Sequence, residues 1–202
     1  MDNAKKYEFT GETRQHLGRT LRRIRSLVSL SNIVAGDVGG WVEDEKNLSH
    51  YGDAWVYGNA RVYGNAWVYG NAWVYGNAQV CGNAQVYGNA QVYGNARVYG
   101  DARVYGNAWV YGNAQVCGNA QVYGNARVTP ICVTGLTYAV TITDHHMMIG
   151  CEFHLISEWR EFDDRRITEM DGLQSSRFWR DHKTVLLAIC DANRPNEAEA
   201  TQ

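Results

Sequence analysis

Tyr51-Gly52-Asp53-Ala54-Trp55-Val56 begins a run of thirteen consecutive hexapeptides that ends with Tyr123-Gly124-Asn125-Ala126-Arg127-Val128. The common pattern is Tyr-Gly-Asn-Ala-x-Val, with few departures. A globular core needs varied side chains in each layer, whereas a solenoid stacks copies of one small unit and so repeats the same residue at the same place. The six-residue period therefore predicts an all-β solenoid over residues 51–128.

The Ala and Val of each hexad are expected to form the interior. They stand two residues apart, so in an extended strand they point to the same face. Across the run these two slots hold only Ala and Val, which predicts a narrow core. Gly and Asn supply the backbone freedom of a sharp corner, because Gly adopts positive φ without steric cost and Asn tolerates it.

This alternation of strand and corner resembles the hexapeptide-repeat family, whose fold is a left-handed parallel β-helix with three hexads in each triangular coil. The handedness is what the resemblance implies. With coils about 4.8 Å apart, the run would form a rod of about four and a third coils, roughly 20 Å long. The Tyr that follows most of these valines departs from the family's usual pattern.

A coil of three hexads stacks side chains that are 18 residues apart, which sorts the outward positions into columns. The most aromatic column contains Trp55, Trp73, Gln91, Trp109 and Arg127. Exposed aromatic surface of this extent is typical of a contact face, although stacked rings would also stabilise successive coils by themselves. The candidate partner-binding residues are Trp55, Trp73, Trp109, Trp67, Tyr69, Tyr87 and Tyr105.

The flanks predict a cap at each end. Residues 1–32 are expected to form an N-terminal cap, and residues 33–128 the solenoid, with a degraded first coil before residue 51 because terminal repeats are atypical. Residues 7–13 alternate like a strand, and Leu17-Gly18 offers a turn. Residues 19–28 have two interpretations: the second arm of a β-hairpin, or a basic amphipathic helix, since their apolar residues also keep helical spacing.

Residues 129–202 are expected to form a C-terminal β-hairpin followed by short helices. The period fails at Thr129-Pro130, and alternation returns in residues 136–143 and 147–151 with a bend at Asp144-His145. Beyond them the apolar residues have helical spacing, with a break at Gly172. Capped ends favour a finite object over a filament, because an open solenoid end exposes unpaired strand edges.

The flanks also sharpen the resemblance. The stretches YEFTGET, AGDVGGWVEDEKNLSHYGDAWVYGNA and GLTYAVTITDHHMMIGCEFHLISEWREFDD are similar to those of an uncharacterised group of hexapeptide-repeat proteins from enterobacteria, their phages and prophages. Members are labelled as transferases or polymer-forming proteins. The likeness covers nearly the whole chain and implies a phage or prophage accessory protein that binds a host protein. It also implies a homo-oligomer, with a side-by-side trimer as the expected form.

One candidate catalytic residue comes from the same resemblance. Hexapeptide-repeat acyltransferases use a histidine general base beside a slot for the pantetheine arm of acyl-coenzyme A. The thirteen hexads contain no His, but His50 immediately precedes them. A general base also needs a partner that orients it, and a single His at a coil edge is otherwise a surface or capping residue.

The densest group of reactive side chains is His145, His146, Cys151 and His154. Cys and His are zinc ligands, and a Cys/His pair can form a nucleophile, so a metal site and a catalytic site on Cys151 and His154 are both open. The alternative is an ordinary hairpin strand in which Cys151 packs as a small apolar residue.

Composition narrows the function. A net charge of -2 gives no global sign of nucleic-acid or membrane binding. The start lacks a secretory leader, and no run of 18 apolar residues occurs. Five cysteines, an odd number without paired spacings, suit a reducing compartment, so a cytoplasmic location in a bacterial host is expected. Only two acids lie in the hexads, which excludes a DNA mimic, and their outward slots hold no Thr, which excludes an ice-binding array.

Three function classes remain. The first is a non-enzymatic structural or protein-interaction solenoid without a cofactor. The second is an acyltransferase that uses acyl-coenzyme A. The third is a nucleic-acid binder that uses the Trp and Arg columns.

Overall fold

The protein divides into two compact units, residues 1–129 and residues 130–202. The computed structural model describes residues 5–126, 130–133 and 135–193. Three positions named above, Arg127, Val128 and Thr129, lie outside the described residues.

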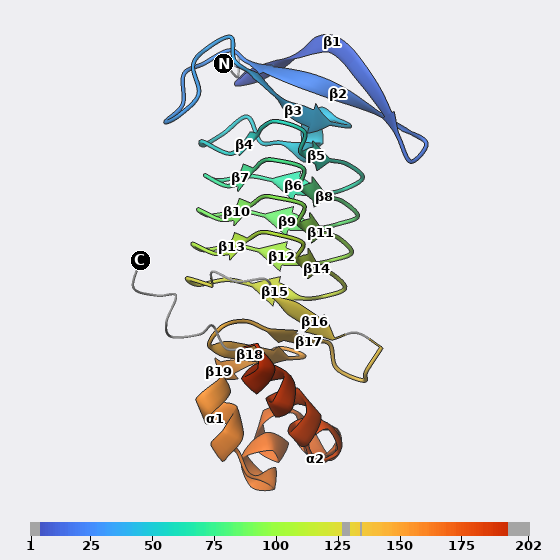
Figure 1. Ribbon diagram of the computed structural model, residues 1–202, viewed down its shortest axis with the longest axis vertical. Helices are drawn as coiled ribbons and strands as arrows, with labels where there is room; N and C mark the ends of the chain where they lie inside the picture. The colour runs from blue at the N-terminus through green and yellow to red at the C-terminus, as the bar shows by residue number, and fades with distance from the viewer. Residues whose placement is uncertain (1–4, 127–129, 134, 194–202) are drawn as a thin grey trace. The chain divides into compact units, whose positions relative to one another are not determined.

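The first unit is a parallel β-solenoid in which each of the twelve hexads from residue 51 to residue 122 contributes one strand of two residues (Figure 1). Each strand consists of the variable residue and the Val that follows it. The strands are β4 (Trp55–Val56), β5 (Arg61–Val62), β6 (Trp67–Val68), β7 (Trp73–Val74), β8 (Gln79–Val80), β9 (Gln85–Val86), β10 (Gln91–Val92), β11 (Arg97–Val98), β12 (Arg103–Val104), β13 (Trp109–Val110), β14 (Gln115–Val116) and β15 (Gln121–Val122).

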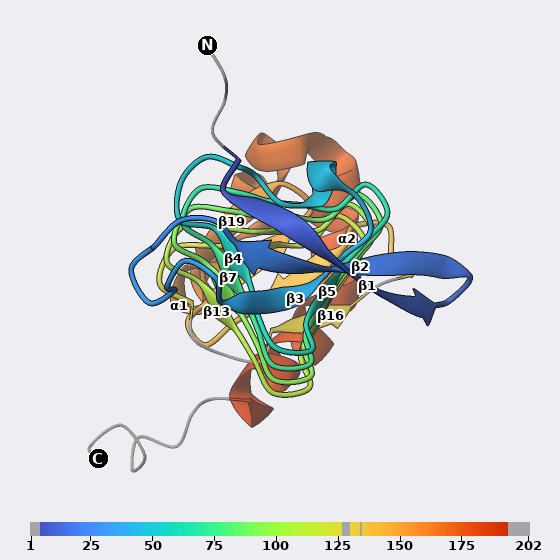
Figure 2. The same cartoon turned by 90° about the horizontal axis from the view of Figure 1, so that it is seen from above.

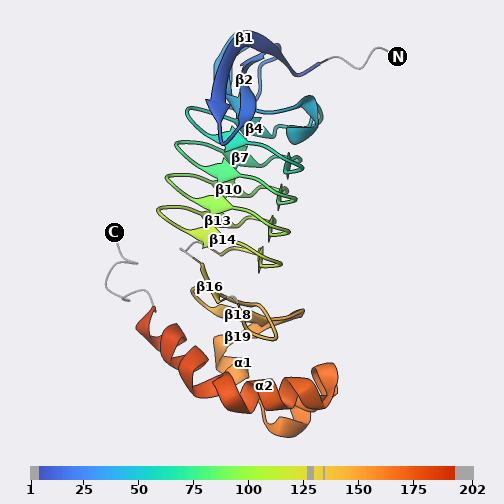
Figure 3. The ribbon, with the colours of Figure 1, turned by 90° about the vertical axis from the view of Figure 1, so that its right-hand side faces the viewer.

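Every third strand belongs to the same sheet, so three hexads complete one coil. The orders are β4-β7-β10-β13, β6-β9-β12-β15 and β5-β8-β11-β14. Seen from above, successive coils superimpose, with β4, β7 and β13 on one side and β5 on another (Figure 2), and Figure 3 shows β4, β7, β10 and β13 stacked in sequence. Trp55 pairs with Trp73, and Trp73 with Gln91. The predicted 18-residue register is therefore confirmed.

The interior of the solenoid is the predicted one. The alanines from Ala54 to Ala120 and the valines from Val56 to Val122 are all buried. The corners depend on glycine: Gly82 has φ +72°, and a Cβ at that position would lie 2.9 Å from the backbone nitrogen of Gly100 in the next coil. Glycine is therefore required both for the backbone conformation and for the close approach of the coils.

The asparagines at the corners form amide ladders between coils. In one ladder the Lys46 ammonium donates to the side-chain oxygen of Asn65, which donates from its Nδ2 to Asn83, which donates to the carboxylate of Asp101. The donors all run in the same direction, so the chain of amides begins at a cation and ends at an anion. Each amide dipole is therefore aligned with its neighbours, an arrangement in which hydrogen bonds polarise one another.

The N-terminal cap is a hairpin that extends one sheet of the solenoid. Strand β1 (Tyr7–His16) pairs antiparallel with β2 (Arg19–Ser26), which pairs with β3 (Val38–Val42), and β3 runs parallel to β5. The turn lies at Leu17-Gly18, both with positive φ, as expected. The helical interpretation of residues 19–28 is wrong, because β2 is hydrogen-bonded on both sides and buries Leu21 and Ile24 against the sheet.

The predicted degraded first coil is irregular. After β3 the chain forms a 3₁₀ turn, η1 (Glu45–Asn47), and then a single parallel bridge between Leu48 and Val68. The side chain of buried Asn47 supplies hydrogen bonds to the next coil: its Nδ2 donates to the carbonyls of Gly64 and Ala66. In the first coil, therefore, side-chain hydrogen bonds of Asn47 supplement a backbone pairing that is limited to one bridge.

The second unit is an antiparallel sheet with helices. Strands β16 (Ile131–Val133), β17 (Val140–Ile142), β18 (His146–Ile149) and β19 (Glu152–Leu155) pair in chain order, followed by α1 (Ile156–Glu161) and α2 (Asp164–Ala192). The expected hairpin is confirmed as β17 and β18, and the expected break falls at Asp171 and Gly172, whose backbone angles interrupt α2. No helix among the described residues is both long and apolar enough to cross a lipid bilayer.

Candidate functional site

One of the three sheets of the solenoid carries aromatic and amide side chains without arginine or lysine at its described outward positions. We call β4, β7, β10 and β13 the aromatic sheet. Its outward residues are Trp55, Trp73, Gln91 and Trp109, and each is followed two residues later by a tyrosine: Tyr57, Tyr75, Tyr93 and Tyr111. The other two sheets each present arginine, at Arg61 and Arg97 and at Arg103 respectively.

Trp55 is not part of the accessible surface, which corrects its assignment as a partner-binding residue. Its exposed fraction is 0%. The N-terminal cap covers it: the ring of Tyr7 meets it edge-on with centroids 6.5 Å apart. Because Tyr7 comes from outside the repeats, the six-residue period contains no sign of this burial.

Three other candidate residues belong to a column of stacked rings. The centroids of Tyr69 and Tyr87 lie 4.8 Å apart and those of Tyr87 and Tyr105 4.9 Å apart, with nearly parallel rings. Trp67, which is 43% exposed, stacks on Tyr69 at 4.0 Å. Neighbouring rings thus cover both faces of Tyr87 and Tyr105, and this column stabilises the rod as a cross-strand aromatic ladder.

Many tyrosine hydroxyls are also used within the rod. Each glutamine of the hexads accepts a hydrogen bond from the tyrosine 16 residues earlier. The pairs are Tyr63–Gln79, Tyr69–Gln85, Tyr75–Gln91, Tyr99–Gln115 and Tyr105–Gln121. Tyr69, Tyr75 and Tyr105 also have stacked rings, so little of these side chains remains for an outside partner.

Tyr57 and Trp73 lie in a groove of the aromatic sheet. The groove has a volume of about 350 Å³ and is lined by Ser31, Asn32, Tyr57, Trp73, Tyr75 and Gln91. We call it the Trp73 groove. The loop between β2 and β3 supplies one wall, and the aromatic sheet supplies the other. Tyr57 is 49% exposed and Trp73 is half-buried.

His50 is held by the N-terminal cap. Its Nδ1 accepts a hydrogen bond from the backbone N–H of Lys6 at 3.1 Å, and its ring stacks on Tyr7 at 4.4 Å. Burial, opposed by the charge of Glu45, lowers the pKa of His50. Because Nδ1 accepts this bond, the neutral imidazole carries its proton on Nε2. The Nδ1 lone pair therefore holds the N-terminal cap in place and is not available to accept a proton from a substrate.

The four His and Cys candidates of the second unit do not converge. Antiparallel pairing places His146 opposite Leu155 and Met147 opposite His154, so His146 and His154 lie on opposite faces of the sheet. His146 stacks on Phe153 at 4.6 Å, while His154 Nε2 contacts Glu152 at 3.0 Å. Cys151 is exposed in the turn between the strands. Among the described residues, no three His, Cys, Asp or Glu side chains are grouped as metal ligands.

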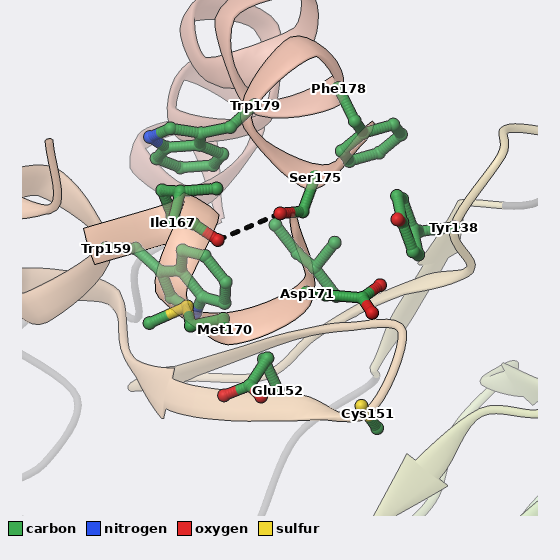
Figure 4. A pocket seen from close by; sticks show the side chains of 11 residues that line it. Tyr138, Cys151, Glu152, Trp159, Ile167, Met170, Asp171, Ser175, Phe178 and Trp179 are labelled. Carbon is green, nitrogen blue, oxygen red and sulfur yellow. Dashed lines mark hydrogen bonds between the residues drawn. The ribbon is translucent and has the colours of Figure 1, made fainter. Parts of the chain in front are cut away.

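Cys151 does line a pocket that the sequence analysis missed (Figure 4). The pocket is small, with a volume of about 30 Å³, and has Trp159, Ile167 and Met170 on one side, Phe178 and Tyr138 on the other, and the Cys151 turn below. The pocket lies beside the break in α2. The hydroxyl of Ser175 bridges this break by hydrogen-bonding to the carbonyls of Ile167 and Gly172. Burial and a hydrogen bond with Asp171 raise the pKa of Tyr138 at its edge.

The repeats match a known family. The YdcK Beta solenoid repeat family matches residues 54–70, 66–82, 90–103, 96–112, 102–118 and 120–130. The chain is a β-solenoid repeat protein. These matches cover the coils that carry the aromatic sheet, and the stacked parallel strands agree with them. No curated protein matches this β-solenoid protein in sequence.

Proposed function

We propose that this β-solenoid protein is a non-enzymatic scaffold that binds its partner on the aromatic sheet. The observation that carries the proposal is the state of Trp73 and Tyr57. Both rings are accessible, both stand on a rigid stack of hydrogen-bonded coils, and no other aromatic ring of the described residues stacks on either. Rigid aromatic side chains of this kind bind with little loss of conformational freedom.

The resemblance of the sequence extends the proposal to the handedness of the solenoid, the origin of the protein, its location and its oligomeric state. The solenoid is a left-handed hexapeptide-repeat helix, and the protein is a phage or prophage accessory protein that acts in the bacterial cytoplasm on a component of the host. Self-association into a trimer belongs to the same proposal. The support for these statements is the likeness of the flanking stretches.

The two other classes have less support. An acyltransferase needs an oriented general base, whereas the Nδ1 of His50 is occupied by the backbone of Lys6. A nucleic-acid binder needs cations along the phosphate backbone, and the aromatic sheet presents none at its described outward positions.

Retention of host components on the immobilised protein tests the proposal. The variants are Trp73→Ser on the aromatic sheet and, as a matched control, Trp67→Ser on a different sheet, both checked for an unchanged β signal by circular dichroism. We expect the wild type and Trp67→Ser to retain the same host component and Trp73→Ser to lose it. Equal retention by both variants would refute the role of the aromatic sheet. Saturable, Trp73-independent binding of acyl-coenzyme A would favour the transferase instead.

A further inference from the structure

The Trp73 groove has the features of a ligand site rather than of the ladder around it. The position 16 residues after Tyr57 is Trp73, whereas five other tyrosines of the rod have a glutamine at the corresponding position. No described residue accepts a hydrogen bond from the Tyr57 hydroxyl, and no described ring stacks on Tyr57 or Trp73. The substitution of Trp for Gln therefore leaves a hydroxyl and two ring surfaces unused in one place.

Polar groups that can donate hydrogen bonds surround these rings. Gln91 accepts from Tyr75 through its Oε1 at 3.0 Å, which leaves the two protons of its Nε2 directed elsewhere. Asn32 lies on the opposite wall, and no described residue hydrogen-bonds to its side chain. Ser31 beside it contacts the carboxylate of Asp53 at 3.4 Å. The groove thus combines flat apolar surfaces with neutral amide and hydroxyl groups.

The lining of the groove carries no formal charge. A nucleic acid would leave its phosphates without cations there, and a charged peptide would lose solvation without gaining a partner. A purely apolar segment would in turn bury the amides of Asn32 and Gln91 without hydrogen bonds, which costs free energy. The remaining chemistry is a neutral molecule with apolar faces and a rim of hydroxyl groups.

We propose that the Trp73 groove binds a neutral oligosaccharide, with a pyranose ring stacked on Trp73 and its hydroxyls hydrogen-bonded to Tyr57, Asn32 and Gln91. This inference rests on the proposed function and names the class of its partner. The C–H groups on one face of a pyranose ring pack against an indole, while its hydroxyls point to the sides, toward the amides.

The sheet allows the sugar chain to continue along the rod. Trp73, Gln91 and Trp109 are successive residues of one in-register column. Adjacent strands lie about 4.8 Å apart, and an extended β-linked glycan advances by nearly the same distance for each ring. Trp109, whose ring meets Tyr93 edge-on, lies two coils from Trp73 in the same column, with Gln91 between them to bind hydroxyl groups.

Isothermal titration with defined glycans tests this inference. The probes are cellohexaose, chitohexaose, maltohexaose, mannohexaose and laminarihexaose, with polygalacturonate as the anionic comparison. We expect saturable binding of at least one neutral probe. Trp73→Ser weakens it by about tenfold or more, Tyr57→Phe weakens it by about threefold through loss of the hydroxyl alone, and Trp67→Ser leaves it unchanged.

The outcomes separate this inference from the function on which it rests. If none of the neutral probes binds, while Trp73→Ser still abolishes retention of a host component, the glycan inference is wrong and the proposed scaffold function is retained. Loss of both readouts overturns both. Preferential binding of polygalacturonate contradicts the neutral ligand. If sedimentation shows that Trp73→Ser converts an oligomer to a monomer and no glycan binds, the groove is occupied by a second copy and the inference fails.

Discussion

The hydroxyl of Tyr75 donates a hydrogen bond to the side-chain oxygen of Gln91, 16 residues later in the chain, at 3.0 Å. The same offset joins every hexad glutamine to a tyrosine in the coil above it. A neutral hydrogen bond of this kind contributes about 1 kcal/mol. Repeated along the rod, these bonds and the stacked rings stabilise the contact between coils independently of the Ala and Val interior.

A double-mutant cycle on Tyr69 and Gln85 measures one such bond. Tyr69→Phe and Gln85→Leu should each destabilise the protein, and urea denaturation should give a coupling free energy of about 1 kcal/mol between them. The matched control is Tyr87→Phe, because the residue 16 positions after Tyr87 is Arg103. A larger loss in Tyr87→Phe than in Tyr69→Phe would contradict the ladder.

Trp55 and Trp73 belong to one column but should behave differently when truncated. Trp55→Ala removes a fully buried ring beneath the cap and should lower the free energy of unfolding by about 3–5 kcal/mol. Trp73→Ala removes a partly buried ring on which no described ring stacks, so we expect a loss of about 1 kcal/mol. Urea denaturation followed by circular dichroism checks both, and equal losses would show that the cap does not cover Trp55 in solution.

The repeats made the solenoid predictable, because their period determines both the pairing and the burial. Ala and Val recur at fixed places, so the 18-residue register of Trp55, Trp73 and Gln91 follows from the sequence once three hexads close a coil. What lies over a coil is encoded elsewhere. The burial of Trp55 depends on Tyr7, and a repeat contains no information about the segment that covers its first copy.

Residues 19–28 show why periodicity alone left two interpretations open. Their apolar residues fit a helix and a strand equally. Hydrogen bonding to neighbouring strands selects the strand, because β1 and β3 both pair with this segment. In the second unit, by contrast, the separation of His146 from His154 follows from strand parity. The Tyr–Gln offset was likewise visible in the sequence as a count of 16 residues. The same count also joins Tyr57 to Trp73 and Tyr93 to Trp109, so it does not by itself identify the Trp73 groove, whose other wall contains Ser31 and Asn32 from outside the repeats.

The corner glycines provide a matched pair for testing how closely the coils approach. Gly82 and Gly118 both have positive φ, but a Cβ at Gly82 meets the backbone of Gly100 at 2.9 Å, whereas a Cβ at Gly118 meets nothing within 4 Å. Gly118→Ala should cost about 1–2 kcal/mol from backbone strain alone. Gly82→Ala should cost more, because two backbones must also separate. Thermal and urea denaturation measure the difference. Equal losses of stability would show that the coils can accommodate a Cβ at Gly82 without separating.

The tyrosine columns should make the protein sensitive to alkaline pH. Burial, together with a hydrogen bond to Cys81, raises the pKa of Tyr63 to about 12, and burial raises the pKa values of Tyr69, Tyr75 and Tyr105. A tyrosine in the unfolded chain ionises near pH 10, so above that pH the folded state binds more protons than the unfolded state. The stabilising contribution is therefore complete below pH 10 and is lost as the pH rises toward 12.

Tyr63→Phe isolates one of these groups. Denaturation of the wild type and the variant at intervals from pH 9 to pH 12 should show the same trend below pH 10. Above it, the stability of the wild type should fall more steeply, by at most about 1.4 kcal/mol for each pH unit, which is the limit for one proton. Comparing the two proteins cancels the other titrating groups. Parallel curves above pH 10 would mean that Tyr63 ionises as readily in the folded rod as in the unfolded chain.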